Sequence, residues 1–167
     1  MERITVLGIG NILLQDEGFG VRVIEQLQQR YCFPANVQVL DGGTLGLELI
    51  RFITGTNKLM VIDAIDGGGA PGFFYRFAGS EAELYLQHQV SMHELGLKDV
   101  LATLTLLEKP VGEVIIMGVE PASLELGLAL SAPVSAMVDR ALLEIIAQLA
   151  VWQVEAGLNG TIKTGVY

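Results

Sequence analysis

The sequence predicts a single three-layer α/β domain, in which helices cover both faces of a twisted, mostly parallel five-stranded sheet. Strand-like apolar runs alternate with helical segments along the chain, an order typical of parallel strands joined by helices. The length of 167 residues suits one domain with a proper core. Hydrophobic residues make up 51% of the chain and charged residues only 17%, which favours a sheet buried on both faces.

The first half of the chain contains four strand-like runs and two helical segments. Strands are expected at residues 3–7, 37–40, 59–64 and 73–77, and helices at residues 18–30 and 45–53. The third run reads Leu-Met-Val-Ile-Asp-Ala and is almost wholly apolar, so we expect it at the centre of the sheet. The fourth follows the glycine-rich loop around residues 66–71 and is a candidate edge strand.

The second half contains more helix. A helix is expected over residues 91–107, a strand over 114–119 and a long helix from residue 131 or 132. Ser91 and Glu94 match the capping-box pattern that opens a helix. His88 precedes this helix in a polar stretch that reads as a solvated loop. We assign residues 1–154 to the domain and expect the Gly- and Thr-rich residues 155–167 to form a loosely held tail.

Composition excludes several classes of function. The net charge of −9 argues against nucleic-acid phosphates and anionic membranes as the main partner. The N-terminal apolar run is too short for a signal peptide, and charged residues interrupt the apolar segment 132–154, so we expect a cytoplasmic protein without a membrane span. Cys32 is the single cysteine, which leaves no intramolecular disulfide and no paired-cysteine metal site. It reads as a packed or incidental thiol.

Polar side chains gather at one edge of the predicted sheet. Asp16 and Glu17 follow the first strand, Asp41 ends the second, and Asp63 ends the third. His93 lies in the first turn of the helix that leads to the fifth strand. Ligands of such sheets bind beyond the carboxyl ends of the strands, so four separate connections deliver carboxylates and an imidazole to the place where a ligand is expected.

Each of these residues also has a structural interpretation. Asp16 and Glu17 are able to cap the first helix, and for Asp16 we favour that role. Asp41 before two glycines is a common turn signature, so a turn and a site role are equally supported. Asp63 is harder to explain structurally, because burying an unpaired carboxylate is costly. His93 could simply fill the start of a helix, although the positive helix end keeps an imidazole neutral, as metal binding requires.

Together the residues indicate a cation site. Two carboxylates and a neutral imidazole suit nickel, zinc or a similar divalent ion. Three protein ligands leave coordination positions open, as in catalytic metal sites.

Other kinds of active or binding site fit the sequence less well. A dinucleotide fingerprint needs a glycine where Leu13 stands, there is no phosphate-binding loop with its lysine and no G-x-S-x-G elbow, and "HELGL" lacks the second histidine of a zinc protease.

At these residues the sequence resembles the nickel–iron hydrogenase maturation endopeptidases. Five blocks carry the resemblance in family order and spacing: "GIGNILLQDEGFGVRVIE", "LDGGTLGLEL", "VIDAI", "SMHELGL" and "GVEPASLELGLALSAPV". The resemblance covers the chain from about residue 3 to about residue 146. Two departures border the expected site: Met92 stands where relatives often have proline, and Glu94 where some have glutamine.

The resemblance implies an endopeptidase that removes a C-terminal extension from the hydrogenase large-subunit precursor after nickel insertion. The family's metal ligands fall on Glu17, Asp63 and His93, and its D-G-G aspartate on Asp41. The implied catalytic residues are Asp41, Glu17 and Asp63, and the implied metal is nickel that arrives within the substrate, although other divalent ions can replace it in the isolated protein. A non-catalytic nickel-sensing chaperone and, less well supported, a Rossmann-like nucleotide-binding enzyme are the alternatives.

Overall fold

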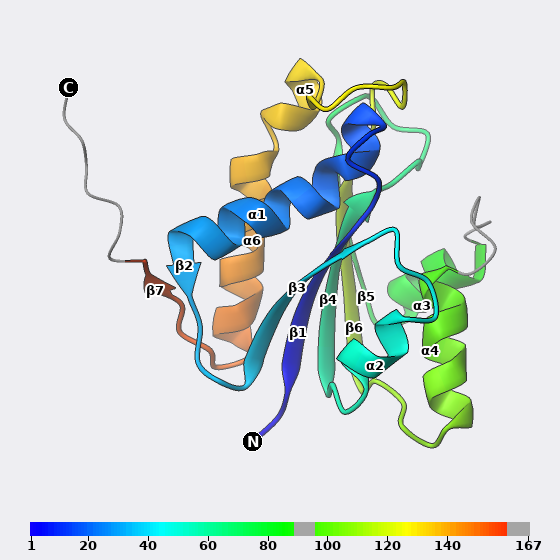
Figure 1. Ribbon diagram of the computed structural model, residues 1–167, viewed down its shortest axis with the longest axis vertical. Helices are drawn as coiled ribbons and strands as arrows, with labels where there is room; N and C mark the ends of the chain where they lie inside the picture. The colour runs from blue at the N-terminus through cyan, green and yellow to red at the C-terminus, as the bar shows by residue number, and fades with distance from the viewer. Residues whose placement is uncertain (89–95, 160–167) are drawn as a thin grey trace.

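The protein is a three-layer α/β domain, as predicted (Figure 1). Its structure, a computed structural model, describes residues 1–88 and 96–159. The main sheet has five strands in the order β3-β1-β4-β6-β5. The bounds of these strands are β1 Ile4–Ile9, β3 Val37–Gly43, β4 Lys58–Ala64, β5 Phe74–Ala78 and β6 Glu113–Val119. All pairs are parallel except β5 with β6, which places the antiparallel β5 at an edge.

β4 lies at the centre of the sheet, as its apolar sequence predicts. Met60 and Ile62 belong to the core cluster on one face, and Leu59 and Val61 to the cluster on the other. Successive side chains of a strand point to opposite faces, so a strand covered on both sides must be apolar at nearly every position. Full burial of such a side chain contributes about 1.5–3 kcal/mol.

Helices cover both faces of the sheet (Figure 1). One face carries the 3-10 turn η1 Gln15–Gly18 and the helices α1 Phe19–Arg30, α5 Ala132–Ser135 and α6 Val138–Val151. The other face carries α2 Leu49–Ile53, α3 Ser80–His88 and α4 Leu97–Leu106. The long final helix of the prediction is therefore two helices, separated by two residues. No helix in the described part of the chain is long and apolar enough to cross a membrane.

The helix α3 lies where the sequence predicts a loop around His88. Only Ala82 of this helix is buried, so its apolar pattern is weak. Tyr85 holds it to the sheet by stacking on Phe77, with ring centroids 5.1 Å apart. His88 is the last residue of α3, and its Nδ1 lies 2.8 Å from the carbonyl oxygen of Leu84. The helix thus depends on a tertiary contact that periodicity does not reveal.

The predicted capping box of Ser91 and Glu94 lies outside the described residues. The described part of the following helix, α4, begins after Gly96, whose backbone N–H donates to the Asp99 carboxylate at 2.9 Å. Asp99 therefore satisfies a backbone donor at the helix start.

The first residues of the predicted loose tail are ordered. β7, Gly157–Leu158, pairs in antiparallel fashion with β2, Tyr31–Cys32. The Asn159 side-chain amide donates to the carbonyl oxygens of Gln28, Gln29 and Tyr31 at the end of α1. Cys32 lies in β2, and its free thiol is exposed rather than packed in the core. Residues 160–167 of the predicted tail lie outside the described residues.

Candidate functional site

The start of α1 packs directly on the sheet through glycines. A Cβ on Gly20 would lie 2.1 Å from the carbonyl oxygen of Ile62, and one on Gly8 would lie 2.4 Å from that of Gly20. Any larger residue would push the helix off β1 and β4. The glycines therefore serve helix–strand packing, and η1, which precedes α1 and carries Glu17, contacts β4.

Asp63 lies in β4 at its carboxyl end and is partly buried. Burial raises the pKa of this carboxyl group to about 8, although a 2.8 Å hydrogen bond from the Ala64 N–H to Oδ1 works against the shift. The negative charge of Glu17 raises the same pKa further. Two predicted ligands, from separate connections, are thus within electrostatic range of one another in a poorly solvated place.

Tyr85 reaches the same place from α3. Burial raises the pKa of its phenol above the ordinary value, and the charge of Asp63 adds to the shift. Tyr85 was not among the predicted site residues. It could not be placed near Asp63 from the sequence, because no helix was predicted over the residues of α3.

Asp41 occupies the neighbouring part of the edge. Both Asp41 of β3 and Ile62 of β4 lie beside Gly8 of β1 in the strand register. The backbones of Asp41 and Asp63 are therefore about two strand spacings, roughly 10 Å, apart. The Asp41 side chain is exposed, and its Oδ1 accepts a 2.9 Å hydrogen bond from the Gly43 N–H. Gly43 has a φ of +47°, so the Asp-Gly-Gly sequence does form a glycine-dependent turn.

Asp16 does not cap the first helix, contrary to the role favoured for it. Its carboxylate is fully buried and binds the loop that follows β6, while no side chain caps η1 or α1. The donors are the N–H and Oγ of Ser131, each at 2.7 Å, and the N–H groups of Ala122 and Ser123 at 2.9 and 3.0 Å. Burial alone would raise the pKa of Asp16, but these hydrogen bonds outweigh it and lower the pKa. Asp16 is a structural residue.

Glu120 fixes another part of the edge and was also missed. It follows β6 directly and is 6% exposed. Its Oε2 accepts hydrogen bonds from the Gly67 N–H at 2.8 Å and from the Tyr75 hydroxyl at 3.1 Å. The carboxylate thereby holds the glycine-rich loop after β4. The sequence does offer one indication of this role, because Glu120 is an acid that directly follows an apolar strand.

The predicted third ligand, His93, lies outside the described residues, as do Met92 and Glu94. Within residues 1–88 and 96–159, no three histidine, cysteine, aspartate or glutamate side chains form a group able to hold a metal ion. What the described residues provide is the pair Glu17 and Asp63. Two carboxylates in a poorly solvated place, where the charge of Glu17 raises the pKa of Asp63, suit a divalent cation, because the cation would remove both the repulsion and the desolvation penalty.

Comparisons with known proteins show the family of the chain. The model of the hydrogenase maturation protease family matches residues 21–148. The chain is 41% identical over 155 residues to the hydrogenase 2 maturation protease of Escherichia coli, covering 92% of this chain and 94% of that protein. It is 37% identical over 164 residues to the hydrogenase expression/formation protein HupD of Rhodobacter capsulatus, covering 97% and 78%.

Solved structures of the same family share the fold. The hydrogenase maturating endopeptidase HybD from Escherichia coli superimposes with a TM-score of 0.88 and 40% identity over 94% of this chain and 98% of that one. The nickel–iron hydrogenase maturation protease HybD from Thermococcus kodakarensis gives a TM-score of 0.71 and 30% identity over 89% and 99%. Sequence blocks, fold and relatives agree, and the chain therefore belongs to the hydrogenase maturation protease family as an endopeptidase of hydrogenase maturation.

Proposed function

We propose that the protein removes the C-terminal extension of a hydrogenase large-subunit precursor after nickel has been inserted. In this proposal Glu17, Asp63 and His93 bind the nickel that the precursor already carries. The nickel is thus part of the substrate, and the enzyme tests for its presence before the peptide bond is cut.

The observation that carries the proposal is the coupling of Glu17 and Asp63. The pKa of Asp63, raised to about 8, means that one carboxyl of the pair holds a proton at neutral pH while no cation is present. Such a pair favours a divalent cation that is already bound to negatively charged ligands of the substrate, because the pair alone carries too little charge to neutralise it. Substrate thiolates would supply such ligands, and soft thiolates suit nickel.

Asp41 is proposed to act at the scissile peptide. Its carboxylate is exposed on β3, roughly two strand spacings from β4, and so lies beside the pair rather than within it. The two glycines that follow allow a substrate backbone to approach closely. Nickel binding would then hold the peptide bond near Asp41, which positions or activates water.

Cleavage of the purified precursor tests this function. The protein is treated with chelator, dialysed and incubated with nickel-loaded or nickel-free precursor, and intact mass is measured. We expect the loaded precursor to lose the mass of its C-terminal extension and the nickel-free precursor to remain whole.

Three outcomes would contradict the proposal. Efficient cleavage of the nickel-free precursor would mean that the carboxylates do not test for nickel. Chelated enzyme that is inactive on loaded precursor and is restored by zinc would be a conventional metalloprotease. Binding without any mass loss would identify a nickel-sensing chaperone.

A further inference from the structure

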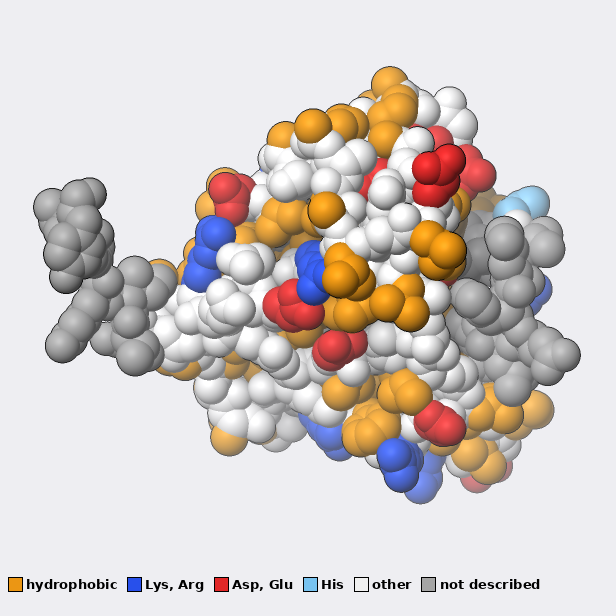
Figure 2. Space-filling view, turned by 45° about the horizontal axis from the view of Figure 1, so that its top comes forward, with side chains coloured by type: hydrophobic (Ala, Val, Ile, Leu, Met, Phe, Trp, Pro, Cys, Tyr) orange, Lys and Arg blue, Asp and Glu red, His pale blue; other side chains and the backbone are white. Residues whose placement is uncertain are grey.

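A group of exposed leucines lies beside the site. Leu124, Leu126 and Leu128 are 48%, 83% and 61% exposed in the loop after β6, and Leu13 is 56% exposed in the loop after β1. The two loops pair directly, because the Gly127 N–H donates to the Leu13 carbonyl oxygen at 2.9 Å. We call these four residues the leucine rim. Figure 2, which brings this end of the molecule forward, shows hydrophobic side chains gathered beside acidic and basic ones.

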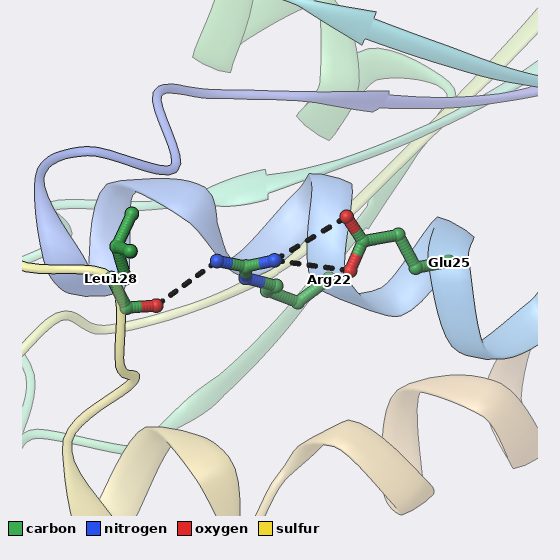
Figure 3. Close-up of polar contacts among 3 residues, drawn as sticks. All are labelled: Arg22, Glu25 and Leu128. Atoms are coloured by element: carbon green, nitrogen blue, oxygen red, sulfur yellow. Dashed lines mark hydrogen bonds and ion pairs between the residues drawn. The ribbon is translucent and has the colours of Figure 1, made fainter.

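The leucine rim is held by buried and long-range polar contacts. The Asp16 carboxylate receives four hydrogen bonds from the two ends of the loop, at residues 122–123 and at Ser131. In the middle, the Gln15 N–H donates to the Gly127 carbonyl oxygen at 2.9 Å. The Arg22 guanidinium donates to the Leu128 carbonyl oxygen at 3.0 Å and pairs with Glu25 (Figure 3).

These hydrogen bonds bear on why the leucines are exposed. A loop with no binding role would be expected to bury such side chains or to have few hydrogen bonds to the rest of the protein. Here the backbone is fixed at both ends and in the middle while the leucines face water. Exposed apolar groups on a pre-ordered surface mark an interaction site, since binding loses little conformational entropy.

The charge of the surrounding loops indicates the chemistry of the partner. The described connections at the carboxyl edge are residues 10–18, 41–48, 64–72 and 120–131, and they contain no lysine or arginine. Their acidic residues are Asp16, Glu17, Asp41, Glu48, Asp66, Glu120 and Glu125. Arg22, the basic residue that reaches the leucine rim from α1, is neutralised by Glu25. A partner segment that fits here is aliphatic and basic.

We propose that the leucine rim is the docking surface for the large-subunit precursor and that it binds an aliphatic, basic segment of that protein. This inference rests on the proposed function, since it names how the same substrate is held beside the site. Binding at the leucine rim would place the C-terminal extension over Glu17, which lies in the turn that Asp16 ties to the loop.

The test compares matched leucine pairs. Leu126→Gln with Leu128→Gln removes apolar contact from the leucine rim without adding charge. Leu106→Gln with Leu143→Gln is the control, because these leucines are 84% and 67% exposed on α4 and α6. Glu125→Lys reverses a charge between two leucines of the leucine rim, and Glu155→Lys does so at an exposed site elsewhere. Thermal unfolding verifies that each full-length variant is folded.

Binding and cleavage are measured separately, with purified nickel-loaded precursor as the probe. We expect the leucine-rim pair to weaken precursor binding and raise KM by about tenfold or more, with kcat at saturation nearly unchanged. Glu125→Lys should weaken binding in the same direction, and the control variants should match the parent protein.

The outcomes separate this inference from the proposed function. Unchanged binding and KM in the leucine-rim pair, with normal cleavage, would overturn the docking surface and leave the function intact. Loss of binding in that pair alone, when even the parent protein cuts nothing, would support docking and overturn the function. A parent protein that does not bind the precursor would overturn both.

Discussion

The surroundings of Asp63 raise the pKa of its carboxyl group, and this shift affects the stability of the protein. The carboxyl group sits at the end of an apolar strand, with the charge of Glu17 close by, and its pKa is raised to about 8. In the unfolded chain the pKa of the same group would be near its ordinary value of 3.8. Keeping this acid at the site therefore costs stability at neutral pH, as functional residues often do.

The first prediction follows from that shift. A raised folded-state pKa means that the folded protein binds the proton more tightly, so the penalty grows as pH rises from about 4 to about 8. Asp63→Asn should therefore stabilise the metal-free protein, by about 1–3 kcal/mol more at pH 8 than at pH 5. Urea unfolding with chelator present measures this. Asp66→Asn, at an exposed acid nearby, is the control, and an equal effect of both substitutions would contradict the assignment.

The second prediction concerns the ligand set. Glu17→Gln, Asp63→Asn and His93→Ala should each abolish precursor cleavage and leave the fold intact, because each removes one contact to nickel. Circular dichroism and the mass-loss assay are run on the same preparations. Near-normal cleavage by Asp63→Asn would refute the ligand set, and unfolding of all three would favour structural roles.

Asp41 gives the third prediction. Asparagine retains an oxygen that can accept the hydrogen bond from the Gly43 N–H, so Asp41→Asn should preserve the turn. It removes the charge that positions or activates water. We expect kcat to fall about 100-fold or more while precursor binding changes little. Equal losses in kcat and affinity would make Asp41 a binding or structural residue.

At the scale of elements, the loop after β6 and the turn η1 behave as one unit. Asp16 joins them through four hydrogen bonds from residues far along the chain. Both sides of this unit matter to the proposed function, since η1 carries Glu17 and the loop carries the leucine rim. Substitution of Asp16 should therefore show how much these hydrogen bonds contribute to the free energy of unfolding.

The fourth prediction is that Asp16→Ala destabilises the protein by about 2–4 kcal/mol at pH 7, because buried donors lose their acceptor. The pKa of Asp16 is lowered, so its contribution is present above pH 4 and is lost as pH falls through the folded-state pKa. The difference from the parent protein should thus shrink near pH 3. Ser131→Ala, which removes one of the four donors, should cost only about 1 kcal/mol. A loss with Asp16→Ala that is no larger than with Ser131→Ala would contradict the shared-anchor role.

At the scale of the whole molecule, the charges at the two ends of the sheet differ. The described loops at the carboxyl edge carry only acids among their charged residues, whereas the opposite end carries both signs, with Arg3, Lys58 and Lys109 near Glu2, Glu108 and Glu113. The net charge is −9. The carboxyl edge is therefore where a basic partner would be attracted.

The fifth prediction follows from this asymmetry. Precursor binding should weaken several-fold between about 50 and 300 mM NaCl, since salt screens attraction between exposed charges. The chelated parent protein and nickel-loaded precursor are titrated at each salt concentration. Binding that is unchanged or stronger at high salt would mean that the acidic edge does not attract the partner.

The sequence alone was enough to predict the sheet and the edge at which the candidate acids lie. Apolar runs of strand length, separated by helical segments, predicted β4 at the centre and the acids at one edge, because parallel strands all end on the same side. The tertiary structure decided what each acid does. Asp16 and Glu17 are neighbours in the chain, yet Asp16 is buried by donors more than 100 residues away, while Glu17 interacts with Asp63. The helix α3 and the strand β7 likewise depend on distant partners, and local periodicity carries no information about such contacts.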